Sequence, residues 1–184
     1  MKRLLIVWHS LTGGAALMAQ AAAAAARAEP DVDLRLRRAS EASAADVLWA
    51  DGYLFATPET LGSMAGLMKD FFDRIYYPAL DQINGRPVAL MVCAGSDGSG
   101  AVRQLQRICT GLRLREAAAP LVINTSAQTP ERILAPKDLG ADDLARCAEI
   151  GAALAAGLAA GILEPQVDGS RSKLSCRRRS GRRR

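Results

Sequence analysis

Several kinds of residue and segment are scarce in this chain of 184 residues, and each scarcity narrows what the protein can be. Aromatic residues make up 4% of the sequence, and His9 is its single histidine. Its four cysteines form no CxxC pair, so we expect no metal site and reduced thiols in a cytoplasm. The uncharged segment 150–163 is shorter than the roughly 20 apolar residues that span a bilayer. The apolar run 4–8 is too short for an export signal. From the two segments together we expect a cytoplasmic protein without a membrane partner.

An excess of charge of one sign is also missing from residues 1–163, which carry 16 basic and 17 acidic side chains. The formal net charge of +5 comes from residues 164–184, where eight basic side chains stand against two acidic ones. We therefore expect one folded domain, 1–163, followed by a basic, disordered tail, 164–184. The tail could touch nucleic acid weakly, or it could be a solvated extension without a role. Beyond that we expect no nucleic-acid partner.

Two common phosphate-binding signatures are absent from the loop HSLTGG, residues 9–14. It has neither the lysine of GxxxxGK[ST] nor the spacing of GxGxxG, which argues against a nucleoside triphosphate site and a dinucleotide fold. The loop does hold two hydroxyls and two glycines directly before an alanine-rich helix. Free N–H groups at a helix N-terminus can bind an anion, although an ordinary capped turn is the alternative. A lone histidine such as His9 is more often structural than a general base.

Apolar segments of strand length alternate with segments of helical periodicity. This order predicts an α/β protein, a three-layer sandwich around a five-stranded parallel sheet in the order 2-1-3-4-5. The apolar stripe from Met64 to Ile75 has helical spacing and predicts a face that packs on the core or on another subunit. The predicted strands are 4–8, 32–37, 52–56, 87–93 and 120–124, the second at an edge, and the predicted helices are 13–28, 42–50, 64–77, 101–112 and 142–163.

Loops rich in glycine and hydroxyl side chains follow three of the predicted strands. They read HSLTGG, TPETLGSMAG and AGSDGSG. The carboxyl ends of parallel strands meet at one edge of a sheet, where ligands bind in such folds, so we expect the three loops to meet there. Asp97 in the third loop has two interpretations, contact with a ligand or capping of the next helix.

These segments resemble the flavodoxin-like FMN proteins. WHSLTGGAAL, FATPETLGSMAGLMKDFFDRIYYPAL and VCAGSDGSGAVRQL are similar to the NAD(P)H:quinone oxidoreductase and NAD(P)H-dependent FMN reductase branch, over about residues 3–163. The resemblance implies that FMN passes a hydride from NAD(P)H, a diffusible co-substrate, to a quinone or similar small acceptor, with no catalytic side chain. The alternative is a flavodoxin-type electron carrier or FMN-binding module without turnover. The near-neutral domain favours a reductase, because electron-shuttling flavodoxins are strongly acidic.

The resemblance also implies which residues hold FMN and how the chain assembles. Leu61 stands where many relatives have an aromatic residue, and the third loop has no tryptophan or tyrosine. We expect a homo-oligomer, a dimer or tetramer, with the helix after the second loop as a contact. The residues implied around the phosphate are Ser10, Leu11, Thr12, Gly13, Gly14 and Ala15; those beside the isoalloxazine ring are Pro58, Glu59, Thr60, Leu61, Gly62 and Ser63; those on its other side are Ala94, Gly95, Ser96, Asp97 and Gly98.

Overall fold

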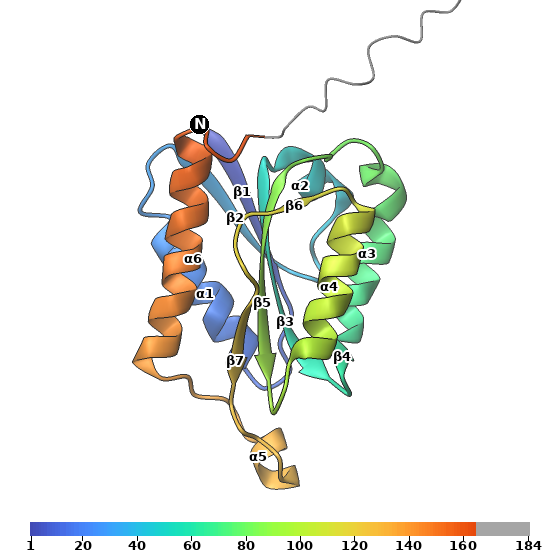
Figure 1. Cartoon of the computed structure of the whole chain (residues 1–184), viewed down its shortest axis with the longest axis vertical. Coiled ribbons are helices and arrows are strands. Elements are labelled where there is room, and N and C mark those ends of the chain that lie inside the picture. The colour runs from blue at the N-terminus through green and yellow to red at the C-terminus, as the bar shows by residue number, and fades with distance from the viewer. Residues whose placement is uncertain (165–184) are drawn as a thin grey trace, which may run out of the picture.

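A parallel sheet forms the middle layer of the computed structural model, which describes residues 1–164 (Figure 1). Helices α1 and α6 cover one face of the sheet, and α2, α3 and α4 cover the other. The predicted tail lies outside the described residues, apart from Glu164. The strands are β1 (Lys2–Trp8), β2 (Val32–Arg38), β3 (Gly52–Thr60), β4 (Ser63–Met64), β5 (Pro87–Ala94), β6 (Arg115–Glu116) and β7 (Leu121–Asn124), and the helices are α1 (Gly14–Ala26), α2 (Ala44–Trp49), α3 (Gly66–Ala79), α4 (Ser99–Gly111), α5 (Pro130–Leu134) and α6 (Ala141–Ala159).

The five predicted strands are β2, β1, β3, β5 and β7, and their order across the sheet confirms 2-1-3-4-5. The described sheet has seven strands because of two short additions. One is β6, which pairs with the start of β5, while β7 pairs with its end. Pro120 separates β6 from β7, and a proline nitrogen cannot donate to a strand ladder. The other is β4, which pairs antiparallel with β3.

The two faces of the sheet are packed with different side chains. On the face under α3 and α4, the aromatic residues Tyr53 and Phe55 of β3 lie in one buried cluster with Phe71 of α3. The face under α1 and α6 is filled largely by alanine and aliphatic residues. Small residues let α1 and α6 approach closely: a side chain at Gly151 would collide with the carbonyl oxygen of Ala22.

The five predicted helices all differ from the observed bounds at their ends, and two of the differences have a clear physical reason. Helix α3 begins at Gly66 instead of residue 64, because Met64 pairs with Glu59 in the sheet. Its stripe is confirmed as core, with Leu67 left partly exposed. Helix α6 ends at Ala159 rather than 163, before a turn at Gly161 with a φ of 70°. No helix within residues 1–164 is long and apolar enough to cross a membrane.

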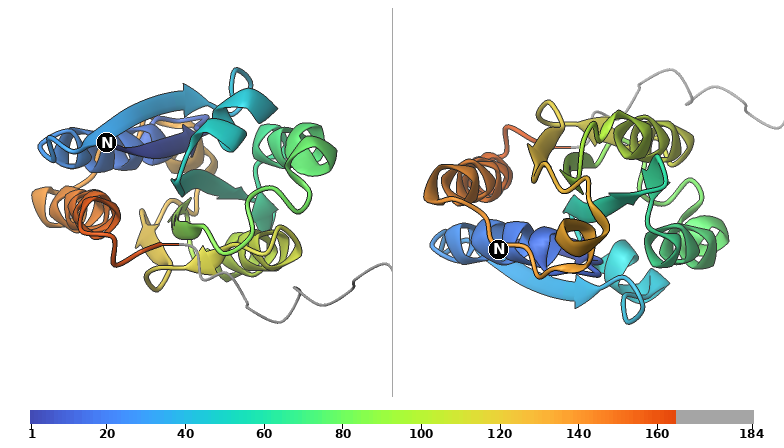
Figure 2. Two further views of the ribbon diagram at one scale, coloured as in Figure 1. Left: turned by 90° about the horizontal axis from the view of Figure 1, so that it is seen from above. Right: turned by 90° about the horizontal axis from the view of Figure 1, so that it is seen from below.

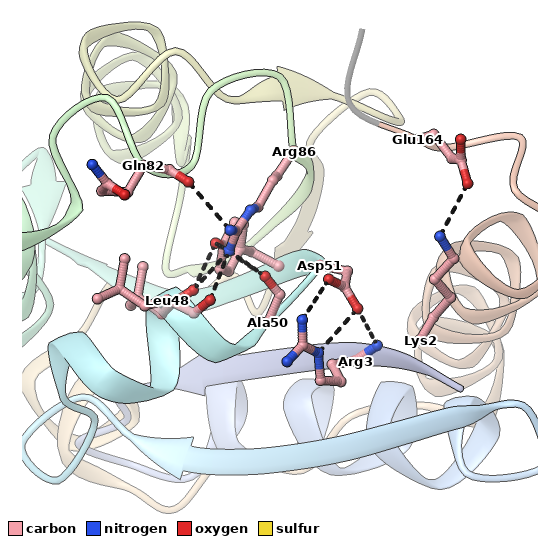
Figure 3. A network of polar contacts seen from close by, with 10 residues as sticks. Lys2, Arg3, Leu48, Ala50, Asp51, Gln82, Arg86 and Glu164 are labelled. Atoms are coloured by element: carbon pink, nitrogen blue, oxygen red, sulfur yellow. Dashed lines mark hydrogen bonds and ion pairs between the residues drawn. The ribbon is translucent and has the colours of Figure 1, made fainter. Parts of the chain in front are cut away.

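Polar side chains close the amino edge of the sheet (Figure 3). The guanidinium of Arg86 donates hydrogen bonds to the carbonyl oxygens of Leu48, at 3.1 Å, and Ala50, which lie at the end of α2. These carbonyls have no partner within their own helix, so Arg86 caps α2 and fixes it to the start of β5. The same figure shows the ion pairs Arg3–Asp51 and Lys2–Glu164.

Candidate functional site

The three predicted loops lie at the opposite, carboxyl edge of the sheet, as predicted. This edge is at the bottom of Figure 1 and faces the viewer on the right of Figure 2. The first loop joins β1 to α1, the second joins β3 to α3, and the third joins β5 to α4. Helix α5 and the chain that follows it cross the same edge between β7 and α6.

The β1–α1 loop presents unpaired backbone donors. Gly13 has a φ of 97°, in the left-handed region that favours glycine, and its N–H donates to Ser10 Oγ at 3.0 Å. The N–H groups of Gly14, Ala15 and Ala16 donate to no acceptor within residues 1–164, and the first turn of α1 has no acidic side chain. The loop therefore offers several N–H groups and the positive end of a helix to one anion.

The same loop is packed between two distant parts of the chain. On one side of the loop lies β5, since a side chain at Gly14 would collide with Cys93 Sγ. On the other side lies the segment 135–140 between α5 and α6, which we call the strap. The N–H of Lys137 in the strap donates to the carbonyl oxygen of Thr12 at 2.7 Å. Sequence reasoning missed Lys137, because no motif links it to a loop more than a hundred residues earlier.

The second predicted loop is wrong in detail, because it is a β-hairpin. Strand β3 continues to Thr60 and turns back through Leu61 and Gly62, whose φ values are 52° and 69°. The side chain of Leu61 at the tip is 100% exposed. Gln104 of α4 holds the returning strand, with its Oε1 accepting from Ser63 Oγ at 2.8 Å and from the N–H of Met64 at 3.0 Å.

Helix α4 also engages the carboxylate of Glu59, which the resemblance places beside the flavin ring. Its two oxygens accept from the N–H groups of Gly98, at 3.2 Å, and Ala101, at 3.0 Å. This carboxylate thus occupies the N-terminus of α4 and compensates its free donors. In the third loop, Asp97 accepts from the N–H of Ser99 at 3.3 Å, which favours capping over ligand contact.

His9 lies at the end of β1, where its N–H donates to the carbonyl oxygen of Ala56 at 3.0 Å. Burial, together with the nearby Arg38, lowers the pKa of His9 below its ordinary value. The imidazole is therefore neutral at neutral pH. Within residues 1–164 its side chain has no hydrogen-bond partner that would orient it as a general base.

A pocket of about 350 Å³ opens beside these loops, between the end of β7, the strap and the start of α6. Its floor includes Ile123 and Leu139, and its rim includes Arg132 and Asp143. None of the residues predicted to hold FMN lines it. Within residues 1–164 no group of acidic, histidine and cysteine side chains is arranged to hold a metal ion.

Comparison with known proteins identifies the fold and the family. Flavodoxin 1 from Bacillus cereus aligns with a TM-score of 0.67 at 20% identity, covering 85% of this chain and 99% of that one. This likeness shows the flavodoxin fold alone.

Two curated relatives match parts of the sequence. A flavodoxin of Aquifex aeolicus is 32% identical over 100 residues, 54% of this chain and 54% of its own. An NAD(P)H dehydrogenase (quinone) of Acidithiobacillus ferrooxidans is 33% identical over 94 residues, 40% of this chain and 47% of its own. The chain thus spans about half the length of the curated relatives it matches.

The family match is longer and covers the three loops. Residues 9–128 match the sequence model of the family described as NADPH-dependent FMN reductase. The matched region begins at His9 in the β1–α1 loop and runs through the hairpin and the β5–α4 loop to the chain beyond β7. The chain belongs to the NADPH-dependent FMN reductase family.

Proposed function

We propose that this protein is an FMN-dependent oxidoreductase that oxidises NAD(P)H and reduces a quinone or a similar small acceptor. The observation that carries the proposal is the β1–α1 loop, with its free N–H groups and no acidic side chain, in a member of this family. Bound FMN would supply the hydride and electron chemistry. The side chains and backbone of this chain bind and orient the reactants, and no side chain is assigned as a catalytic acid, base or nucleophile.

The residues of the β1–α1 loop fit a terminal phosphate. The N–H groups of Gly14, Ala15 and Ala16 are unpaired among the described residues, and the Thr12 hydroxyl lies in the same loop. Gly13 keeps its left-handed conformation without strain, which shapes the loop for a group with several acceptor oxygens. Ser10, Leu11, Thr12, Gly13, Gly14 and Ala15 would hold the phosphate.

The flavin ring would lie between the hairpin and the β5–α4 loop. The tips of both segments are exposed: Leu61 and Gly62 in the first, Ser96 and Asp97 in the second. Within residues 1–164 the N–H groups of Ser96 and Asp97 have no acceptor, so they can donate to the polar edge of the ring. The Glu59 carboxylate would support the site by fixing α4, because both of its oxygens accept hydrogen bonds from N–H groups at the start of that helix.

An electron carrier of the flavodoxin type is the second candidate, favoured by the relative named flavodoxin. Against it stands the near balance of 16 basic and 17 acidic side chains in residues 1–163. A carrier docks on redox proteins through complementary charge, and this domain has little net charge to offer.

Two measurements test the function and separate the candidates. Purified protein stripped of ligand is titrated with FMN, and flavin fluorescence and the visible spectrum report binding. The loaded protein is then given NADH or NADPH with a soluble quinone, and we expect steady oxidation of one nucleotide. Bound FMN without turnover would favour the carrier, and failure to bind FMN would overturn both candidates.

We further propose a homo-oligomer, a dimer or tetramer, that uses the outer face of α3. The C-terminal half of this helix exposes Tyr76, Tyr77 and then Leu80, with Tyr77 80% exposed. Tyrosine is enriched at the centres of protein interfaces. Light scattering on Tyr77→Glu should show a smaller species than the parent.

We also propose a reducing, cytoplasmic location. The buried free thiols of Cys93, Cys109 and Cys147 support this proposal, because thiols stay reduced in the cytoplasm.

A further inference from the structure

We propose that Lys137 is a positioning residue that holds the β1–α1 loop in the shape that binds the FMN phosphate. The proposal rests on the proposed function. The family match ends at residue 128, so the strap and Lys137 lie outside the matched region. The inference depends on three contacts of Lys137, made by its backbone, its aliphatic stem and its ammonium group.

The backbone contact fixes one peptide unit of the loop from both ends. The carbonyl oxygen of Thr12 accepts from the N–H of Lys137 at 2.7 Å. The N–H of the same peptide unit, that of Gly13, donates to Ser10 Oγ at 3.0 Å. A peptide unit is planar, so holding both groups fixes its orientation. The next N–H groups, from Gly14 onward, then point in one direction before any ligand arrives.

The aliphatic stem of Lys137 packs on Gly14, the next residue of the β1–α1 loop. Its Cβ and Cγ lie 3.3 and 3.5 Å from the position that a Cβ at Gly14 would take. Cys93 Sγ fills the space on the other side of the loop. Gly14 is therefore enclosed between β5 and the strap, and the loop has little room to move.

The ammonium group of Lys137 stabilises the strap itself. Its Nζ donates to the carbonyl oxygens of Arg132 at 2.7 Å, Ile133 at 2.9 Å and Ala135 at 2.6 Å. These carbonyls lie at the end of the short helix α5, where a cation is favoured. The side chain thus folds the strap back on α5 and presents the backbone N–H of residue 137 to Thr12.

Two variants of Lys137 separate these contacts, and a third serves as control. Lys137→Pro removes both the N–H that reaches Thr12 and the ammonium group, so its difference from Lys137→Met reports the N–H contact. Lys137→Met keeps an unbranched stem and removes the ammonium group. Lys2→Ala removes a lysine whose ion pair with Glu164 lies at the amino edge, far from the loop. Each apoprotein is titrated with FMN and with riboflavin, which lacks the phosphate, and circular dichroism checks that it is folded.

We expect Lys137→Pro to weaken FMN binding by roughly three- to tenfold, the loss of about one hydrogen bond, and Lys137→Met by less. Riboflavin binding and the Lys2→Ala control should stay within experimental error of the parent. A merely structural role would weaken both flavins equally. If both Lys137 variants keep the parent's ratio of FMN to riboflavin affinity, the proposal is overturned while the function stands.

Hydrogen exchange on the apoproteins decides the proposal without any flavin. We expect the hydrogen-bonded amides of Gly13 and Leu17 to exchange faster in both variants than in the parent, and amides of the sheet to be unchanged. If the parent binds no FMN, the proposed function fails, and the exchange rates still test the contact of Lys137 with the loop. Equal rates in all four proteins would refute it.

Discussion

At the scale of single residues, Leu61 combines a φ of 52° with complete exposure of its side chain. A bulky residue in the left-handed region costs roughly 1–2 kcal/mol, and asparagine tolerates that region far better. Strain of this kind persists mostly at functional sites. We therefore expect Leu61→Asn to raise the free energy of unfolding by about 1 kcal/mol and to weaken flavin binding or turnover.

Chemical denaturation and FMN titration of the same preparations check both halves of this prediction. Leu134, another exposed apolar residue at the carboxyl edge, offers a control, since Leu134→Asn changes polarity without a left-handed residue. A more stable Leu61→Asn protein with unaltered FMN binding and turnover would show that the leucine has no functional role.

His9 predicts a pH dependence of stability. Burial, with Arg38 nearby, lowers its pKa in the folded state below the ordinary value of 6.5. Below that pH the unfolded chain binds a proton that the folded protein resists, so stability is lost as pH falls. Between about pH 7.5 and about pH 5.5, His9→Gln should lose less unfolding free energy than the parent. Parallel losses, measured by chemical denaturation at both pH values, would show that His9 titrates normally.

At the scale of elements, β4, the returning strand of the hairpin, is held to α4 by one side chain. Gln104 Oε1 accepts two hydrogen bonds, from Ser63 Oγ and from the N–H of Met64. Gln104→Ala should cost about 1–3 kcal/mol of stability, because the part-buried Met64 N–H loses its partner. FMN affinity should fall with it, since the hairpin flanks the ring. Gln106→Ala on the same helix is the matched control, and equal FMN affinity in both proteins would show that the hairpin is held by other contacts.

The close approach of α1 and α6 predicts contrasting effects of two glycine substitutions. A Cβ at Gly151 would collide with the carbonyl oxygen of Ala22, whereas one at Gly111 would meet nothing within 4 Å. We expect Gly151→Ala to destabilise the protein by about 1–3 kcal/mol, because the helices must move apart. Gly111→Ala should be neutral or stabilising. Similar midpoints of thermal unfolding for the two variants would contradict this packing.

The same scale shows which elements a sequence can reveal. The segment 64–77 predicts a helix because its apolar residues recur with helical spacing. The segment 87–93 predicts a strand because its apolar residues form a continuous run of strand length. Strands β4 and β6 have two residues each and α5 has five, too few for a period. Leu61-Gly62 also lacks the Asn-Gly or Asp-Gly signal typical of a two-residue hairpin, so the second loop is predicted as irregular.

For the whole molecule, the separation of charge predicts that the tail and the candidate site act independently. All eight basic side chains of the predicted tail 164–184 lie within residues 165–184. Glu164, the first residue of that tail, forms an ion pair with Lys2. Truncation after Glu164 should leave FMN affinity and turnover unchanged. It should also remove any salt-sensitive adherence to nucleic acid, measured by retention on immobilised DNA. Loss of FMN binding would show that the domain extends beyond residue 164.

The candidate site was predictable to the extent that it lies in short stretches of sequence. Each loop follows a recognisable strand, and parallel topology brings the loops to one edge. The contacts of Glu59 with α4 and of Lys137 with Thr12 join residues far apart in the chain. No local pattern encodes such contacts, because they depend on how the elements pack.

The pairing of the first helix with the last has a consequence for synthesis on the ribosome. Chains emerge N-terminus first, so β1, its loop and α1 are made long before α6 can cover their face of the sheet. The strap that contacts Thr12 also emerges late, just ahead of α6. A nascent chain therefore exposes an alanine-rich helix and an unsupported loop until nearly all of the domain is translated. We expect cofactor loading to be among the last events in the making of each molecule.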